Sequence, residues 1–163
     1  MLPPAGERKP VEWVEALTPA GYDPEHQALV SLYNVRPSAG GGMFVDSEDL
    51  VTLMAVDRNW LRRQLGINPA AAALLTVQGD SMMDTLQPGE IILIDLEKVT
   101  PRDGIYVVRL HGLLLVKRLQ ILPDAILVKS DNAQYQSFQI PLASPSDLEI
   151  VGRVVWSWQG RRF

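Results

Sequence analysis

The second half of the chain alternates between short apolar runs and turn-forming pairs, which is the pattern of a β protein. Six runs predict strands: 74–78, 90–95, 105–110, 113–119, 125–129 and 149–158. The pairs that separate them favour turns: Pro88-Gly89, Asp103-Gly104, His111-Gly112 and Pro123-Asp124. His111-Gly112 predicts a tight hairpin. The connections are too short for crossover helices, so the pattern predicts a compact, mostly antiparallel β domain.

The first third of the chain has a different pattern. Residues 1 to 24 contain five prolines, which forbid a long helix and indicate a linker. A strand is predicted over 29–35, and it ends at the flexible run Pro37-Ser38-Ala39-Gly40-Gly41-Gly42. Residues 47–66 predict one strand and one short helix, with Asp57 as the N-cap and Gly66 as the stop.

Composition narrows the classes of function. The chain has 163 residues, 47% hydrophobic content and a net charge of −4, which argues against free-standing nucleic-acid binding. It has no cysteine, which excludes disulfides and thiolate metal sites and fits a cytoplasmic protein. No apolar run approaches the roughly 20 residues of a membrane span, and no signal-peptide pattern opens the chain. We therefore expect no membrane partner. The acidic residues do not form a spaced cluster, so we also expect no metal and no cofactor.

One segment carries the candidate chemistry: Val77-Gln78-Gly79-Asp80-Ser81-Met82-Met83. Its small-residue turn presents a serine directly after a predicted strand. A later apolar strand, Leu113-Leu114-Leu115-Val116, delivers Lys117. A serine hydroxyl is a poor nucleophile until a base removes its proton. A lysine can be that base when it is unprotonated, and desolvation lowers its pKa.

Strand alternation places Lys117 among aliphatic residues. It shares a face with Leu113, Leu115 and Leu119, whereas Arg118 lies on the other face and is the better candidate for an exposed charge. Taken alone, the serine fits an ordinary turn and the lysine fits an edge strand. The two positions together favour a Ser–Lys pair.

A Ser–His–Asp triad is the rival chemistry. The histidines of the chain are His26, in a polar segment of the arm, and His111, at the predicted hairpin tip. Both positions favour solvated side chains. Asp131-Asn132 is interpreted as turn chemistry.

These motifs resemble the self-cleaving family of LexA, the lambdoid phage repressors and the UmuD polymerase subunit. The resemblance runs from the Tyr33 region to Trp156 and includes Gly-Asp-Ser-Met, Pro-Gly-Glu with Ile-Leu-Ile-Asp, Val-Lys-Arg-Leu, Ser130-Asp131-Asn132 and 150–156. It implies a LexA/signal-peptidase-like β domain. It further implies that Ser81 is the nucleophile, that Lys117 is the general base, and that the substrate is a peptide bond of the protein's own chain. Backbone N–H groups of Ser81 and Asp80 would form the oxyanion hole.

The glycine-rich run is the predicted scissile loop. Ala39-Gly40 is the bond type often cut in the family, since small residues let the backbone enter a narrow cleft. The three consecutive glycines leave a cut at Gly40-Gly41 open. Ala5-Gly6 and Ala20-Gly21 lie deeper in the arm and rank lower.

The resemblance divides the chain into an arm (1–28), a strand with the cleavage loop (29–46) and a Ser–Lys peptidase and dimerisation domain (47–163). We expect a homodimer, because Trp156 and Trp158 near the chain end suit an interface. The resemblance implies a bacterial or prophage repressor that is cut in the SOS response to DNA damage, with a RecA–single-stranded DNA filament as activator. DNA binding would need a helix-turn-helix domain that this sequence does not contain. A UmuD-like polymerase accessory subunit and a catalytically silent dimerisation module remain the alternatives.

Overall fold

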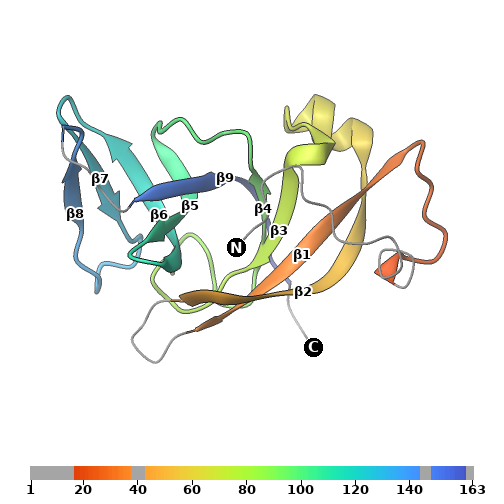
Figure 1. The fold of residues 1–163 in the computed structure, drawn as a ribbon, viewed down its shortest axis with the longest axis horizontal. Helices are drawn as coiled ribbons and strands as arrows, with labels where there is room; N and C mark the ends of the chain where they lie inside the picture. The colour runs from red at the N-terminus through yellow and green to blue at the C-terminus, as the bar shows by residue number, and fades with distance from the viewer. Residues whose placement is uncertain (1–16, 38–42, 144–147, 161–163) are drawn as a thin grey trace.

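The computed structural model describes residues 17–37, 43–143 and 148–160, and within them the fold is mostly β (Figure 1). Nine strands form one mixed sheet among these residues. Their bounds are β1 (Gln27–Pro37), β2 (Met43–Asp57), β3 (Ala72–Thr76), β4 (Ile91–Asp95), β5 (Gly104–Leu110), β6 (Leu113–Ile121), β7 (Ala125–Lys129), β8 (Phe138–Pro141) and β9 (Glu149–Trp158). A π-helix, η1 (Trp60–Gln64), and a 3-10 helix, η2 (Pro69–Ala71), lie between β2 and β3.

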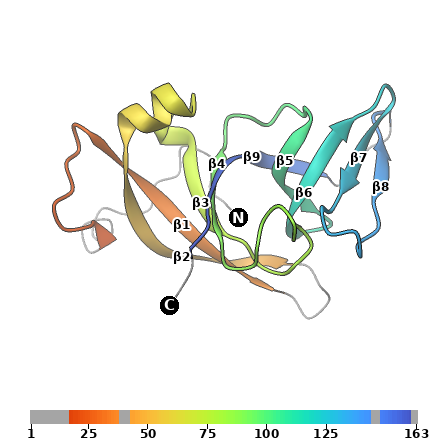
Figure 2. The same ribbon diagram turned by 180° about the vertical axis from the view of Figure 1, so that it is seen from behind.

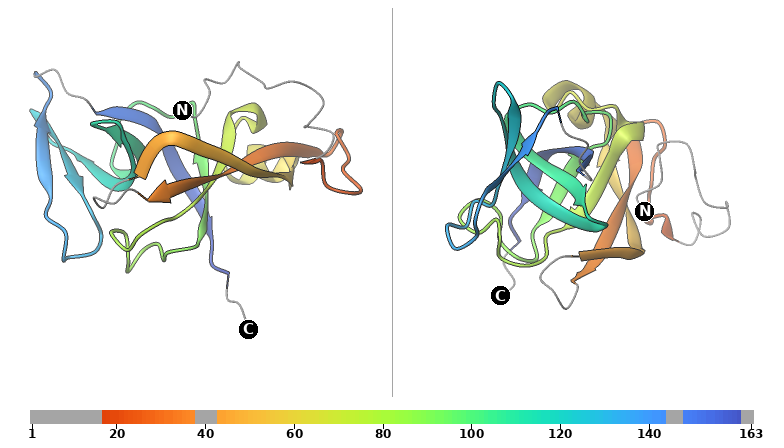
Figure 3. Two further views of the ribbon diagram at one scale, coloured as in Figure 1. Left: turned by 60° about the horizontal axis from the view of Figure 1, so that its bottom comes forward. Right: turned by 60° about the vertical axis from the view of Figure 1, so that its left-hand side comes forward.

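The sheet almost closes on itself. Its strand order is β2-β1-β3-β4-β9-β5-β6-β7-β8, and β2 also pairs with β6. This extra pairing makes a ring of the first seven strands in that order and leaves β7 and β8 as an extension of β6. Figures 1 and 2 show β7 and β8 at one end of the molecule and the start of β1 at the other. Figure 3 shows the same separation from two further directions.

The predicted antiparallel β architecture is confirmed, with a single parallel pair, β1 with β3. The strands predicted at 125–129 and 149–158 have the observed bounds. The strand predicted at 74–78 begins two residues earlier, because Ala72 and Ala73 pair with Asp95 and Ile94 of β4. β8 was not predicted. The hairpin at His111-Gly112 is confirmed, with φ angles of +50° and +78°.

The N-cap of η1 is Asn59, which makes no side-chain capping bond, and the predicted N-cap Asp57 caps the helix from two residues before Asn59. The Asp57 carboxylate accepts a 2.7 Å hydrogen bond from the Trp60 N–H, and Gly66 follows the helix with φ +64°. No helix in the described ranges has the length and apolarity needed to span a bilayer.

Three buried clusters pack against the sheet, and two of them use opposite faces of the β3–β4 pair. One joins Leu75 and Ile92 of the β3–β4 pair to Leu114 and Val116 of β6. Another packs β1 against η1 and β3. Gly152 on β9 lets that strand approach β4 closely, since a Cβ there would lie 2.6 Å from Ile94 Cγ2 and 2.7 Å from the Asp95 carbonyl oxygen.

Candidate active site

Ser81 lies in the loop between β3 and β4, and main-chain hydrogen bonds hold the two ends of this loop together. The N–H of Val77 donates to the Glu90 carbonyl at 2.8 Å, and the N–H of Gly89 donates to the Val77 carbonyl at 2.8 Å. The loop, yellow-green in Figures 1 and 2, runs past the lower end of β6. The strand pair therefore presents the residues between Val77 and Gly89 as one closed loop.

A glycine and a helical turn shape the segment around Ser81. Gly79 has φ +70°, which a glycine adopts without steric cost. The Met82 carbonyl accepts main-chain hydrogen bonds from Thr85 at 3.1 Å and from Leu86 at 2.8 Å. The side chains of Met82 and Leu86 are buried in the core. The turn is therefore held in place by packing on the core, and Ser81 is half-buried at its start.

Lys117 lies on β6, in alternation with the buried residues Leu114 and Val116. Its side chain is half-buried, and this burial lowers the pKa of the amine below its usual value. The Nζ atom donates a 2.6 Å hydrogen bond to Ser130 Oγ and lies 5.6 Å from the centre of the Tyr135 ring. Among the residues that the structure describes, Nζ makes no hydrogen bond to Ser81.

Residues 130–135, between β7 and β8, contact both the Ser81 turn and the lysine. The Asn132 N–H donates to the Ser81 carbonyl at 3.0 Å, and the Asn132 side-chain amide donates to the Asp80 carbonyl at 3.0 Å. Ser130 is two residues away, so its Cα lies within about 7 Å of the Asn132 Cα. One short segment therefore binds the main chain at Ser81 and the amine of Lys117.

Tyr135 adds a further link between the same elements. Its hydroxyl donates to the Asp80 carboxylate, and this bond raises the pKa of the Tyr135 phenol. Its ring lies near the Lys117 amine. An aromatic face attracts a nearby cation, so the ring favours the protonated form of the lysine.

Arg118 and Asp131 form an ion pair at the same place. The guanidinium donates two 2.7 Å hydrogen bonds to the two carboxylate oxygens of Asp131, and the Thr85 hydroxyl donates to that carboxylate at 2.6 Å. The Arg118 guanidinium holds the pKa of the Asp131 carboxyl below its usual range. The Arg118 side chain is 37% exposed and Asn132 Oδ1 accepts from the Gln134 N–H at 3.0 Å, which agrees with the predicted exposed charge and the predicted turn. The tertiary contacts of Arg118 and Asp131 were not predicted. These side chains fasten the 130–135 segment to β6 and to the Ser81 turn.

The long β1–β2 hairpin reaches the same region. Its register runs from Gln27 opposite Asp57 to Pro37 opposite Met43. Met43 then pairs with Leu114 of β6, three residues before Lys117. At 3.3 to 3.4 Å per residue, this is about 10 Å along the strand.

The first strand of the hairpin contacts the serine loop. The Gln78 side-chain amide donates to Asn34 Oδ1 at 2.9 Å, and Gln78 is three residues before Ser81. The predicted scissile bond, Ala39-Gly40, lies outside the described residues, as do Ala5-Gly6 and the other glycines of the run. Both strands that flank the predicted loop are nonetheless held against the two elements of the candidate site.

A family model described as Peptidase S24-like matches residues 31–155. The chain belongs to this family. The predicted resemblance is thereby confirmed at the level of the family, and the matched range contains Ser81, Lys117 and the whole 130–135 segment.

Two curated relatives of this S24-like chain are regulators by name. The 26 kDa repressor protein of Escherichia phage HK022 is 32% identical over 130 residues, which cover 77% of the chain and 55% of the repressor. An uncharacterized HTH-type transcriptional regulator of Haemophilus influenzae is 29% identical over 134 residues, which cover 80% of the chain and 56% of the regulator. The chain thus spans about half the length of these relatives.

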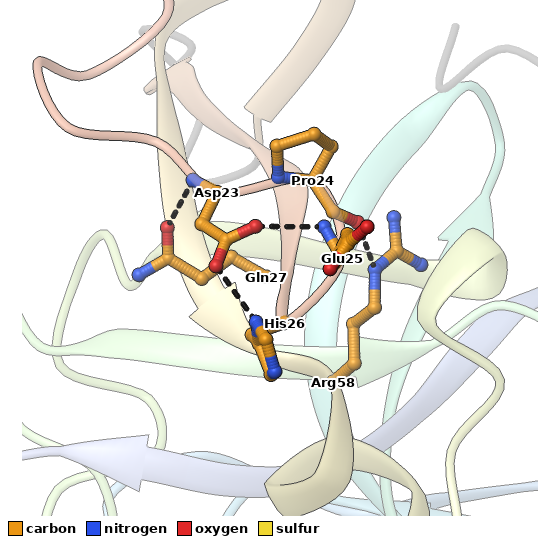
Figure 4. Close-up of polar contacts among 6 residues, drawn as sticks. All are labelled: Asp23, Pro24, Glu25, His26, Gln27 and Arg58. Carbon is orange, nitrogen blue, oxygen red and sulfur yellow. Dashed lines mark hydrogen bonds and ion pairs between the residues drawn. The ribbon is translucent and has the colours of Figure 1, made fainter.

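His26, one of the two histidines of the rival chemistry, is paired with an aspartate in the arm and not with Ser81. His26 Nδ1 lies 2.7 Å from Asp23 Oδ2, and the Arg58 guanidinium donates to the Pro24 carbonyl at 3.1 Å (Figure 4). This loop is exposed and precedes β1, at the end of the molecule opposite β7 and β8. Its hydrogen bonds shape the entry into β1, and the His26 bond lowers the pKa of Asp23. Within the described part of the chain, no group of His, Asp and Glu side chains is arranged to hold a metal ion.

Four residues of the candidate site were not predicted to take part in it: Ser130, Asp131, Asn132 and Tyr135. The Ser130-Asp131-Asn132 motif was recognised as part of the family resemblance, and this was the available signal. Its role was not visible because its partners, Asp80 and Lys117, lie far away in the sequence.

Proposed function

We propose that this chain is the self-cleaving part of a bacterial or prophage repressor, with Ser81 as the nucleophile and Lys117 as the general base. One observation carries the proposal: a half-buried lysine of lowered pKa is tied, through one short segment, to the turn that presents a serine. Membership of the S24-like peptidase family supports the same reading.

The chemistry follows from these groups. Neutral Lys117 takes the proton from Ser81 Oγ as this oxygen bonds to the carbonyl carbon of Ala39. The Asp80 and Ser81 main-chain N–H groups, which donate to no other described residue, would hold the developing oxyanion. The lysine then gives its proton to the Gly40 nitrogen, the peptide bond breaks, and a water molecule hydrolyses the Ser81 ester.

The hairpin supports Ala39-Gly40 as the bond that is cut. β1 contacts the Ser81 loop at Gln78, and β2 pairs with β6 close to Lys117. A short loop that joins these strands has a high effective concentration at the site. Because the resting amine makes no hydrogen bond to Ser81 within the described residues, the two side chains must come into hydrogen-bond contact before the cut.

Assembly and control form the second part of the proposal. Trp156 is 45% exposed on β9 and contacts Trp60, and this apolar surface suits a homodimer in the cytoplasm. DNA binding would reside in a helix-turn-helix segment beyond this sequence, as the name of the Haemophilus influenzae relative suggests. By resemblance to LexA, a RecA–single-stranded DNA filament would stimulate cleavage during the SOS response, which would separate DNA binding from dimerisation.

The decisive test is the Ser81→Ala variant. Purified wild-type protein should convert slowly into two fragments at alkaline pH, and the variant should stay intact while its melting temperature is unchanged. Ser137→Ala is a matched control, since Ser137 is exposed in the loop before β8. Cleavage of the Ser81→Ala variant at the wild-type rate excludes Ser81 as the nucleophile. A wild-type protein that never cleaves favours the catalytically silent dimerisation module.

A further inference from the structure

The Ser130 hydroxyl is the described hydrogen-bond partner of the Lys117 amine. The distance from Nζ to Oγ is 2.6 Å, and Ser130 is only 8% exposed. The hydroxyl oxygen can accept from the ammonium and also from an N–H of the neutral amine, which leaves the lone pair of the neutral amine free to face Ser81. The bond can therefore persist in both protonation states of the lysine.

The position of this hydroxyl is fixed from both sides of the candidate site. Asp131, the next residue, binds the Arg118 guanidinium on β6. Asn132, one residue further, binds the main chain of Asp80 and Ser81. Ser130 thus stands on a segment whose place is defined relative to the lysine strand and to the serine turn at once.

A lysine needs such a fixed partner. Its four-carbon stem has many rotamers, and its ammonium is a compact charge without directional preference. The face of the Tyr135 ring, 5.6 Å away, attracts the charge without fixing a hydrogen-bond direction. The bond to Ser130 supplies that direction.

We propose that Ser130 is a positioning residue that holds the Lys117 amine within reach of Ser81. The proposal rests on the proposed function, since positioning matters only if Lys117 is the base. Ser130 itself does not touch the substrate or exchange a proton with Ser81.

Ser130 has two effects on Lys117 that can be measured separately. As an acceptor for the ammonium it stabilises the charged form, so its removal lowers the pKa of Lys117 and shifts the rate profile to lower pH. As a guide for the neutral amine it raises the rate at the alkaline plateau, so its removal lowers that plateau. A role in folding alone would change neither the midpoint nor the plateau.

The other ionisable groups around Lys117 are the same in the wild type and in the Ser130 variants. The ionisable side chains of the neighbouring elements are Tyr106 of β5, Arg118 of β6, Lys129 of β7, Arg153 of β9, Asp80 of the serine turn, and Asp131 and Tyr135 of the 130–135 segment. None of them is altered by a substitution at Ser130.

The test compares self-cleavage rates from neutral to alkaline pH for the whole chain and for variants at this position. Ser130→Ala should lower the plateau about tenfold and move the midpoint to lower pH. Ser130→Thr keeps the hydroxyl and should restore both. Ser137→Ala should match the wild type. If Ser130→Ala does not fold, Ser130→Thr and Ser130→Val form the matched pair, because they differ by a hydroxyl and a methyl group.

An NMR titration of the Lys117 side chain in the Ser81→Ala background gives a readout without cleavage. Adding Ser130→Ala should lower the titration midpoint of Lys117. If the wild type cleaves, and Ser130→Ala has the same plateau rate and leaves the Lys117 titration unchanged, the positioning role of Ser130 is overturned. The proposed function then still stands. A wild type that does not cleave overturns the proposed function, and the positioning role with it.

Discussion

The main-chain N–H of Asn132 donates a 3.0 Å hydrogen bond to the carbonyl oxygen of Ser81. This bond joins the turn after β3 to the segment after β7, two parts of the chain that no strand pairing connects directly. Because the same segment binds Lys117 and Arg118, the geometry of the candidate dyad depends on the 130–135 segment as much as on the strands that carry Ser81 and Lys117.

The ion pair between Arg118 and Asp131 should make stability depend on acid pH. The pKa of Asp131 in the folded protein lies below its ordinary value of 3.8, so near that pH the unfolded chain binds more protons. The pair therefore contributes fully above the unfolded-state pKa and is lost as the pH falls through the folded-state pKa. Asp131→Asn should cost about 1 kcal/mol near neutral pH and less below about pH 4. Denaturant unfolding at both pH values measures this, and an equal loss at both would contradict it.

Gly152→Ala should destabilise the fold. The new Cβ would lie 2.7 Å from the Asp95 carbonyl oxygen, a main-chain atom that cannot move without disturbing the β4–β9 pairing. Overpacking of this kind costs about 1 to 3 kcal/mol. Gly160→Ala is the control, because a Cβ there meets no atom within 4 Å. Equal unfolding midpoints for the two variants would argue against a tight approach of β9 to β4.

Self-cleavage without an activator should accelerate from neutral to alkaline pH. Burial lowers the pKa of Lys117 below 10.5, the ordinary value, so the neutral base becomes available as the pH rises toward that lowered pKa. Lys117→Arg should be inactive throughout, because a guanidinium does not lose its proton at usable pH. Lys129→Arg, on β7, is the matched control and should retain activity. Gel densitometry measures the cleavage rates. A cleavage rate that does not change with pH, or an active Lys117→Arg variant, would reject Lys117 as the base.

The chain should form a homodimer through the surface around Trp156. Trp156→Glu places a charge on an exposed apolar position of β9 and should shift the protein to monomer. Val99→Glu is the control, since Val99 is similarly exposed, at 46%, in the loop after β4. Sedimentation of the three proteins at tens of micromolar compares them. A monomeric wild type, or equal dissociation by both variants, speaks against this interface.

Local patterns predicted most of the fold. The bounds of β7 and β9 were predicted because both are runs of mainly apolar residues, and the turn-forming pair Pro123-Asp124 precedes β7. β8 lacked this signal, since Phe138 and Gln139 are both exposed and Pro141 ends the strand. The closing pair of β2 with β6 was also beyond prediction, because one ladder of two residue pairs, far apart in the sequence, leaves no local pattern.

In the candidate site, too, the local signals were predicted and the tertiary contacts were not. Ser81 and Lys117 were identified because a glycine turn and a lysine within an aliphatic strand are visible in single segments. The contacts of Ser130 with Lys117 and of Tyr135 with Asp80 are tertiary. They depend on how β6 and β7 lie relative to the serine loop, and the sequence of the 130–135 segment shows only a turn signal at Ser130-Asp131-Asn132.

Intact-mass spectrometry of the purified chain, held for hours at neutral and at alkaline pH, tests the central claim most directly. The account predicts two fragments whose masses place the cut between Ala39 and Gly40, faster at alkaline pH and absent in Ser81→Ala. A cut between Gly40 and Gly41 would move the scissile bond by one residue within the same loop. A chain that remains intact at every pH and with a RecA–single-stranded DNA filament added, or fragments that begin at Gly6 or Gly21, would contradict the account.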